Sequence, residues 1–194
     1  LPLNHEMDAA QVSAIGPGAE DGARRPEADI LSVGPEYFDV LRIPVREGRA
    51  FESADAFDRS KVAVVNAALA ARLWSGRSPL GQHLWLNDTR EPYVVVGVVG
   101  STAQVDLTGT VRDQVFVPAG QNPWAYFRIL ARGSAGRPQD VTGLGAAIHN
   151  VDPLLPISEV RRLQEVVDDF LLPQRSLGLV LFVLGGFALW LALF

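Results

Sequence analysis

Hydrophobic residues along the chain form short extended runs separated by stretches with helical spacing. Helical spacing follows Gly34-Pro35, Ser53-Ala54-Asp55 and Asn66, and it covers residues 138–151 and 161–172. The pattern predicts an α+β fold, a mixed arrangement of strands and helices in one domain or in two lobes. Extended runs typical of β-strands cover residues 29–33, 45–51, 61–65, 82–86, 93–99, 114–117, 126–131 and 157–160.

One segment carries the signals of a strand, a helix cap and a helix in succession. Asn66 follows the apolar run 61–65, and an asparagine side chain suits the position before the first turn of a helix. Leu69 and Leu73 are spaced as neighbours on one helical face, and Gly76 suits the position after a helix end. We therefore expect a buried strand that leads directly into a short helix.

The next two extended runs predict a β-hairpin. Runs 82–86 and 93–99 are separated by Asn87-Asp88-Thr89-Arg90, a sequence rich in turn residues. Residues Asn87 to Thr89 also form a glycosylation sequon. We interpret them as a turn, because Asn and Asp tolerate the left-handed backbone that turns require.

The two ends of the chain differ from its middle. Residues His5 to Arg25 are rich in Gly, Ala, Asp and Glu without a sustained period, so we expect 1–28 to be an exposed, partly flexible segment without a site. Leu177 to Phe194 has no charged side chain, and as a helix it is about 27 Å long, close to the roughly 30 Å of a bilayer's hydrocarbon core. We expect 177–194 to be the start of a transmembrane helix, with a buried core helix as the alternative, and 29–176 to be the folded domain.

Charge and cysteine content narrow the classes of partner. The chain has 22 acidic and 17 basic residues, for a formal net charge of −5. It therefore lacks the basic stripe that a phosphate backbone requires, and nucleic acid is not an expected partner. It has no cysteine, which excludes disulfides and thiolate chemistry but fits an oxidising or a reducing compartment.

The motifs that could support catalysis or nucleotide binding are incomplete. Gly76 to Gly81 has the outer glycines of a phosphate-binding loop, but Gln82 and His83 stand where lysine and Ser or Thr are required. We interpret this stretch as a helix end and a proline turn. Ser78 lacks the spacing of a nucleophile elbow, and Gly97 to Ser101 lacks the glycine pattern of a dinucleotide site.

The titratable residues do not predict a site either. His5, His83 and His149 have no paired ligand spacing. Asp168 and Asp169 are adjacent on a predicted helix, so they point about 100° apart and cannot face each other across a substrate. We predict no catalytic, cofactor-binding or metal-binding residues and no enzymatic activity. A membrane-tethered hydrolase is the least supported function.

Several short motifs occur in an order that resembles a known family. Together, over Asp29 to Phe194, they resemble the periplasmic core domain of MacB-like and FtsX-like ABC-transporter permeases, in particular the orphan permeases of Acidobacteria. Gly34 departs from the family pattern, which has Ser or Thr before this proline. The motifs are Val33-Gly34-Pro35-Glu36-Tyr37-Phe38, Leu41-Arg42-Ile43-Pro44, Gly48-Arg49-Ala50-Phe51, Val62-Ala63-Val64-Val65-Asn66, Ser78-Pro79-Leu80-Gly81, Val95-Val96-Gly97-Val98-Val99-Gly100, Val115-Phe116-Val117-Pro118, Val151-Asp152-Pro153-Leu154-Leu155-Pro156 and Pro173-Gln174-Arg175.

The resemblance implies a non-catalytic permease subunit of the bacterial inner membrane, with this domain on the periplasmic or extracellular side. If the domain has two lobes, the resemblance implies that one is porter-like and the other is smaller and β-rich. The implied partners are a separate cytoplasmic ABC ATPase, which alone would use ATP, and a second permease copy that forms a dimer. An adaptor or substrate protein outside the membrane is a further implied partner, as is the lipid bilayer through 177–194. The implied role is to couple ATPase-driven motion to export or to work on an extracytoplasmic substrate or partner.

One junction is expected to matter for such coupling. Pro173, Gln174 and Arg175 separate the predicted helix 161–172 from the apolar run. Proline interrupts helical hydrogen bonding, so a kink or a restart is expected there, and we predict a coupling junction. The alternative function is a membrane-anchored ligand-binding or sensor ectodomain that works without an ATPase.

Overall fold

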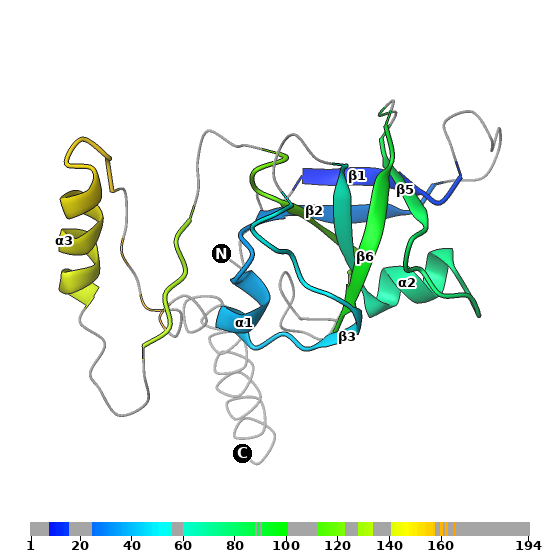
Figure 1. Ribbon diagram of the computed structural model, residues 1–194, viewed down its shortest axis with the longest axis horizontal. Coiled ribbons are helices and arrows are strands. Elements are labelled where there is room, and N and C mark those ends of the chain that lie inside the picture. Colours follow the sequence, from blue (N-terminus) through cyan, green and yellow to red (C-terminus); the bar gives the residue numbers. More distant parts are fainter. Residues whose placement is uncertain are drawn as a thin grey trace, which may run out of the picture. The chain divides into compact units, whose positions relative to one another are not determined.

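The chain forms two compact units, residues Leu1–Arg132 and Gly133–Phe194. The computed structural model describes residues 8–15, 25–55, 60–87, 89, 91–100, 112–122, 128–133, 141–157, 160, 162 and 165. In these residues the first unit contains seven strands and two helices, and the second contains one helix, α3 (Figure 1).

The elements of the first unit follow most of the predicted runs. The strands are β1 (Asp8–Ser13), β2 (Glu27–Val33), β3 (Val45–Gly48), β4 (Val62–Asn66), β5 (His83–Leu86), β6 (Tyr93–Val99) and β7 (Gln114–Pro118). The helices are α1 (Tyr37–Leu41) and α2 (Ala67–Leu73) in this unit, and α3 (Val141–Val151) in the second.

The strands pair in the order β3-β6-β4-β7-β2-β1-β5, and a further pairing joins β5 to β6. Six strands, β6, β4, β7, β2, β1 and β5, therefore form a closed ring of pairings, and β3 lies outside the ring beside β6. The pairs β2–β7 and β4–β6 are parallel, whereas the others are antiparallel. The pairing of His83 with Val94 confirms the predicted hairpin.

The inside of the ring is filled by one hydrophobic cluster, the inner core. Alternate residues of a strand point to opposite faces. One face of each of the six ring strands therefore contributes side chains to this cluster. Helix α2 adds Leu69 to it, and Trp74 follows from the residue after the helix end. The buried members are Val12, Ala28, Ala63, Val65, Leu69, Trp74, Leu84, Leu86, Tyr93, Val95, Val98, Val115 and Val117.

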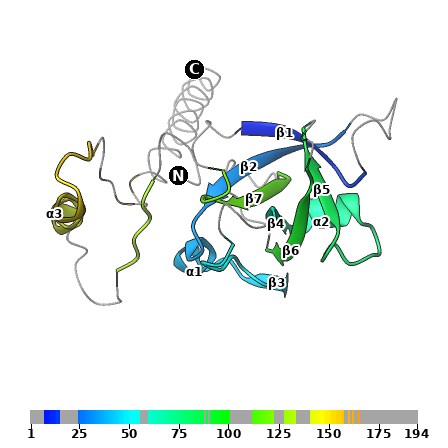
Figure 2. The same ribbon diagram turned by 45° about the horizontal axis from the view of Figure 1, so that its top comes forward.

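A second cluster, the outer core, lies on the opposite face of the same strands. Val64 of β4 and Phe116 of β7 face it, while their neighbours in sequence face the inner core. The ring centroid of Phe38 on α1 lies 5.1 Å from that of Phe116 in an edge-on arrangement. Helices α1 and α2 thus lie on different sides of the strands, as Figure 2 shows. Burial on both faces explains why four successive residues are apolar in each of β4 and β7.

A close backbone approach fixes where β6 lies against the segment after β3. A Cβ atom on Gly97 would lie 2.1 Å from the Arg49 carbonyl oxygen, well inside contact distance. Gly48, with φ of 71°, pairs with Gly97 across the two strands. The register of β6 against β4 shifts by one residue at this point. Glycine in a strand often marks such an irregularity, so Gly97 has a packing role here.

Some predicted elements are wrong. The expected exposed stretch from His5 to Arg25 is wrong for Asp8–Ser13, which forms β1 and buries Ala10 and Val12. Residues 128–131, expected to be part of a strand, have no regular structure, and neither do Ile157 and Val160. The expected helix entry at Ser53 is a turn, in which the Asp55 carboxylate accepts hydrogen bonds from Arg49 at 2.8 and 3.0 Å.

Two predictions concern residues outside the described ranges. Most of the predicted helix 161–172 and the whole apolar run 177–194 lie there. In the part of the chain that the structure describes, no helix is long and apolar enough to cross a membrane. The domain boundaries at residues 28 and 176 stay predictions.

Candidate functional site

The stretch that resembles a phosphate-binding loop is a turn, as the sequence predicts. Gly76 and Gly81 have φ of 76° and 73°, the left-handed region that glycine adopts without strain. Pro79 is buried, and the Ser78 hydroxyl accepts a hydrogen bond from the Leu80 amide at 3.3 Å. These contacts account for the glycines and the proline without a nucleotide.

The other candidate residues of the sequence are not brought together. His83 is exposed on β5 and His149 is exposed on α3, whereas His5 lies outside the described residues. Among the residues with a described position, no group of three or more His, Asp or Glu could hold a metal ion. Asp168, Asp169 and the predicted coupling junction, Pro173, Gln174 and Arg175, also lie outside the described ranges.

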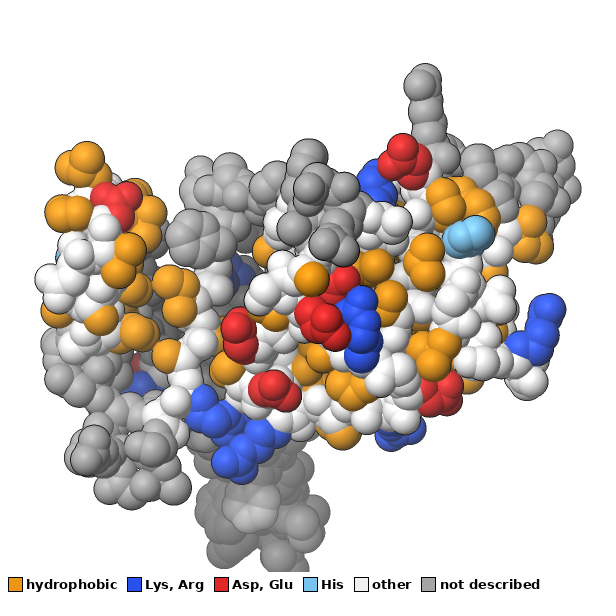
Figure 3. Space-filling view, in the orientation of Figure 1, with side chains coloured by type: hydrophobic (Ala, Val, Ile, Leu, Met, Phe, Trp, Pro, Cys, Tyr) orange, Lys and Arg blue, Asp and Glu red, His pale blue; other side chains and the backbone are white. Residues whose placement is uncertain are grey.

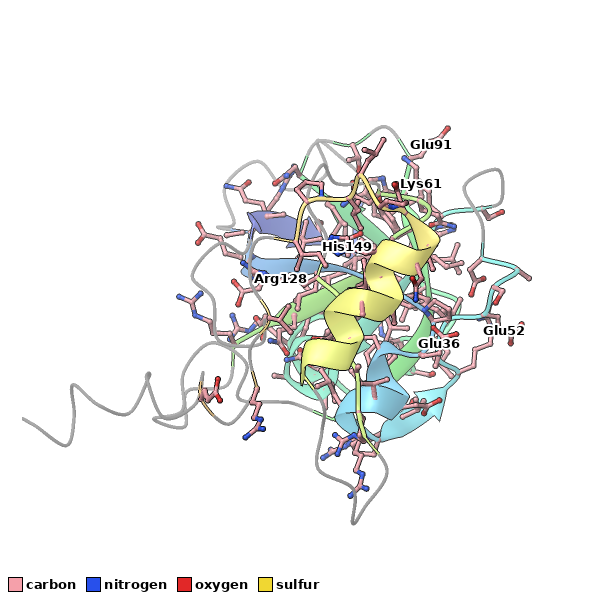
Figure 4. All side chains as sticks on the ribbon, turned by 90° about the vertical axis from the view of Figure 1, so that its left-hand side faces the viewer. Glu36, Glu52, Lys61, Glu91, Arg128 and His149 are labelled. Carbon is pink, nitrogen blue, oxygen red and sulfur yellow. The ribbon has the colours of Figure 1, made fainter. Side chains whose placement is uncertain are left out.

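Some surface charges of the first unit are paired, and charges of both signs are dispersed over its surface. Lys61 Nζ lies 3.5 Å from Glu91 Oε2, and Figure 4 shows the two side chains beside each other. On the face in Figure 3, acidic and basic side chains are interspersed among apolar ones. This mixture does not mark that face as a site for a strongly charged partner.

A buried polar cluster lies where β2, β4, α2 and β7 meet. Asn66 is fully buried, and its side-chain oxygen accepts hydrogen bonds from the Leu69 amide at 3.0 Å and the Gln114 amide at 3.2 Å. Its side-chain nitrogen donates to the Arg112 carbonyl at 2.7 Å. Asn66 therefore caps α2, as predicted, and also joins the helix to the start of β7. The members of the cluster are Asp29, Asn66, Arg72, Arg112, Asp113 and Gln114.

Two buried carboxylates of the cluster each face one arginine. Asp29 Oδ1 accepts a hydrogen bond from Arg112 Nη1 at 3.3 Å. Asp113 Oδ2 lies 3.0 Å from Arg72 Nη1 as an ion pair. Even so, Asp29 Oδ2 and both oxygens of Asp113 are buried without a hydrogen bond. Burying such atoms costs free energy, so the cluster does not maximise stability.

Burial in the folded protein raises the pKa of both carboxylates. Burial raises the pKa of Asp29 above 3.8, an effect that the charge and hydrogen bond of Arg112 oppose. Burial also raises the pKa of Asp113 above 3.8; Arg72 opposes this shift and the nearby Asp29 adds to it. Burial outweighs the ion pair in both cases.

We expect the substitution Asp113→Asn to raise the midpoint of thermal unfolding at pH 7. The folded state holds the Asp113 proton more tightly than the unfolded state, so the ionised carboxylate is unfavourable to folding above its folded-state pKa. This penalty is relieved as the pH falls toward 3.8. The gain should therefore shrink between pH 7 and pH 4, as measured by circular dichroism at both values.

The matched control for this prediction is Glu47→Gln, which removes one carboxylate from an exposed position of β3. It should change the midpoint little at either pH. A loss of stability in Asp113→Asn at pH 7 would mean that the ion pair with Arg72 outweighs the cost of burial.

A cavity of about 520 Å³, the α2 cavity, lies next to the cluster. Arg72, which is paired with Asp113, also lines this cavity, so the cluster holds part of the cavity wall. The described lining contains no nucleophilic side chain paired with a base. The lining residues are Val12, Ser13, Ala14, Ile15, Arg25, Pro26, Arg72, Leu73, Trp74, Arg77 and Gln82.

Comparison with known families gives the decisive observation. The sequence model of the family described as the MacB-like periplasmic core domain matches residues 4–151. This range includes every described strand and helix of both units. The chain belongs to this family. The match includes β1, which the sequence pattern did not predict.

Individual relatives of this periplasmic core domain are distant. The macrolide export ATP-binding/permease protein MacB of Sodalis glossinidius is 29% identical over 151 residues, which cover 74% of this chain and 21% of that protein. The ABC transporter permease YknZ of Bacillus subtilis is 26% identical over 73 residues, or 38% of this chain and 18% of that protein. The chain thus spans about a fifth of the length of these relatives.

A solved structure has a related fold. The periplasmic region of MacB from Actinobacillus actinomycetemcomitans superposes with a TM-score of 0.51 at 16% identity, covering 74% of this chain and 63% of that one. At this identity the likeness concerns the fold alone. It agrees with the mixed α+β class that the sequence predicts.

Apart from the Asn66 cap, the polar cluster and the α2 cavity were not predicted. The sequence does contain a pattern that could have indicated the two carboxylates. Asp29 begins the run Asp-Ile-Leu-Ser-Val, and Asp113 begins the run Asp-Gln-Val-Phe-Val. In the structure Asp29 is the third residue of β2, and Asp113 directly precedes β7. The parallel pairing of β2 with β7 then places them next to each other, and the Asp29 amide donates to the Asp113 carbonyl at 2.9 Å.

Proposed function

We propose that this chain is the extracytoplasmic part of an ABC-transporter permease that couples the motion of a separate ATPase to an extracytoplasmic substrate or partner. Membership of the MacB-like periplasmic core domain family, over residues 4–151, is the observation that carries the proposal. The domain lies on the periplasmic or extracellular side of a bacterial inner membrane. It has no catalytic role, and ATP is used only by the partner ATPase.

The features of the first unit support a mechanical role. Buried apolar residues cover both faces of β2, β4, β6 and β7, and densely packed elements move as units. No nucleophile with a base is present among the described residues of the α2 cavity. A second permease copy and an adaptor or substrate protein complete the proposed assembly.

In this proposal Pro173, Gln174 and Arg175 form the coupling junction between the domain and the membrane helix at 177–194. Inserting a short Gly-Ser linker after Arg175 should abolish transport while leaving folding and the ATPase rate nearly unchanged. A flexible coil absorbs a displacement that a helix would transmit. Transport, ATPase rate and thermal stability are to be measured in the full permease complex with and without the insertion.

The control is the same insertion after Asn87, in the exposed turn between β5 and β6. This insertion lengthens the chain equally but leaves the junction intact, so transport should persist. Normal transport with the linker after Arg175 would show that the junction carries no coupling. Additional hydrophobic spans in the full-length gene would favour a permease, whereas a signalling domain would instead favour a sensor ectodomain.

A further inference from the structure

The lining of the α2 cavity differs in charge from the chain as a whole. The chain has a formal net charge of −5, yet this lining contains three arginines and no acidic residue. Arg25 precedes β2, Arg72 belongs to the last turn of α2, and Arg77 belongs to the turn that follows α2. Two segments far apart in the sequence, the residues before β2 and the end of α2 with its following turn, thus bring positive charge to one cavity.

Structural roles explain only part of this arrangement. Arg72 is paired with Asp113, and a cation in the last turn of α2 also matches the partial negative charge of a helix end. Arg77 lies beyond the helix and is exposed, and no ion pair or hydrogen bond joins its guanidinium to a described residue. Its place at the cavity therefore has no structural explanation among the described contacts.

The rest of the lining is mostly apolar. Val12 and Trp74 belong to the inner core and form buried parts of the wall. Ile15 has 47% of its surface exposed, which is high for a large apolar side chain next to a cavity. A volume of about 520 Å³ falls within the range of roughly 300–1,000 Å³ typical of small-molecule sites.

We propose that the α2 cavity binds an amphiphilic anion, a small molecule with a phosphate or carboxylate group and a short apolar chain. Arg77 and Arg72 bind the anionic group, since guanidinium groups match the geometry of phosphate and carboxylate oxygens. The apolar chain lies against Ile15 and Leu73, the accessible large apolar side chains of the lining. This binding goes beyond the proposed coupling function and does not depend on an ATPase.

Calorimetric titration of the 194-residue chain tests the proposal. The chain is held in nanodiscs of zwitterionic lipid, and empty nanodiscs are titrated as the blank. Octyl phosphate and octanoate are the probes, and they show which anionic group is preferred. At least one should bind with a stoichiometry near one. Arg77→Gln should weaken binding about tenfold or more, as expected for loss of a charge-assisted hydrogen bond, whereas Arg46→Gln on exposed β3 should leave it unchanged.

Other probes separate this site from nonspecific binding. Equal binding of octyltrimethylammonium would contradict an anion site, and equal binding of inorganic phosphate would contradict a role for the apolar lining. An unchanged affinity in Arg77→Gln, or no binding of either probe, would overturn the proposal. Arg72→Gln is a second variant with thermal unfolding as its check, because Arg72 is also the partner of buried Asp113. If the Arg72→Gln variant fails to fold, the titration of Arg77→Gln still tests the proposal.

Discussion

Replacing Gly97 with alanine is expected to destabilise the first unit more than any exposed substitution. The added methyl group would lie 2.1 Å from the Arg49 carbonyl oxygen, which is backbone and cannot rotate away. Either β6 or the segment after β3 must then shift, at a cost of about 3 kcal/mol. Urea unfolding of the variant should show a lower midpoint with an unchanged slope, as expected for a stability loss in a cooperative domain.

Gly120→Ala is the matched control for this prediction. A Cβ atom at Gly120 meets nothing within 4 Å, and the residue is exposed in the turn after β7. The change should alter the free energy of unfolding by no more than about 0.5 kcal/mol. Equal stabilities of the two variants would mean that the backbone at Gly97 yields without cost.

Asn66→Ala is expected to have an effect of similar size for a different reason. The substitution removes the cap of α2 and leaves the Gln114 amide and the Arg112 carbonyl without their Asn66 partner. Loss of a cap costs about 1 kcal/mol, and an unsatisfied buried polar group costs about 1–3 kcal/mol. We therefore expect a loss of about 2–4 kcal/mol in the free energy of unfolding, measured by chemical denaturation.

Asn66→Ser separates the two contributions. A serine at this position can still cap α2, but its shorter side chain cannot also make the bonds to Arg112 and Gln114. Its stability should lie between those of the wild type and Asn66→Ala. If Asn66→Ser and the wild type were equally stable, the bonds to the start of β7 would contribute nothing. Asn122→Ala, which alters a partly exposed asparagine after β7, serves as the background control.

Short sequence patterns predicted the elements whose formation depends on residues that are close together in the sequence. The apolar run before Asn66, its cap and the glycine after the helix each depend on neighbours in sequence, and all three are confirmed. Strand β1 was missed because its buried positions, Ala10 and Val12, are few and one of them is small. Pairing with β2 and β5, which no local pattern reveals, makes this segment a strand.

The polar cluster shows why site residues are harder to predict than strands. Asp29 and Asp113 are far apart in the sequence, and each reads as a polar residue at a strand boundary. Only the parallel register of β2 and β7 brings them together and buries them beside Arg72 and Arg112. The α2 cavity likewise combines residues from four stretches of the chain, 12–15, 25–26, 72–77 and Gln82. Such sites depend on topology, which hydrophobic periodicity does not specify.

The closed ring of strands has a consequence for the order in which the protein folds. Strand β7 lies between β2 and β4, yet it is the last of the ring strands along the chain. Until residues 114–118 are synthesised, β2 and β4 each lack a neighbour and expose an unpaired edge to other chains. Contacts between segments this distant in sequence also slow folding. The nascent domain is therefore most prone to aggregation just before β7 inserts, and a chaperone that covers strand edges would act in that interval.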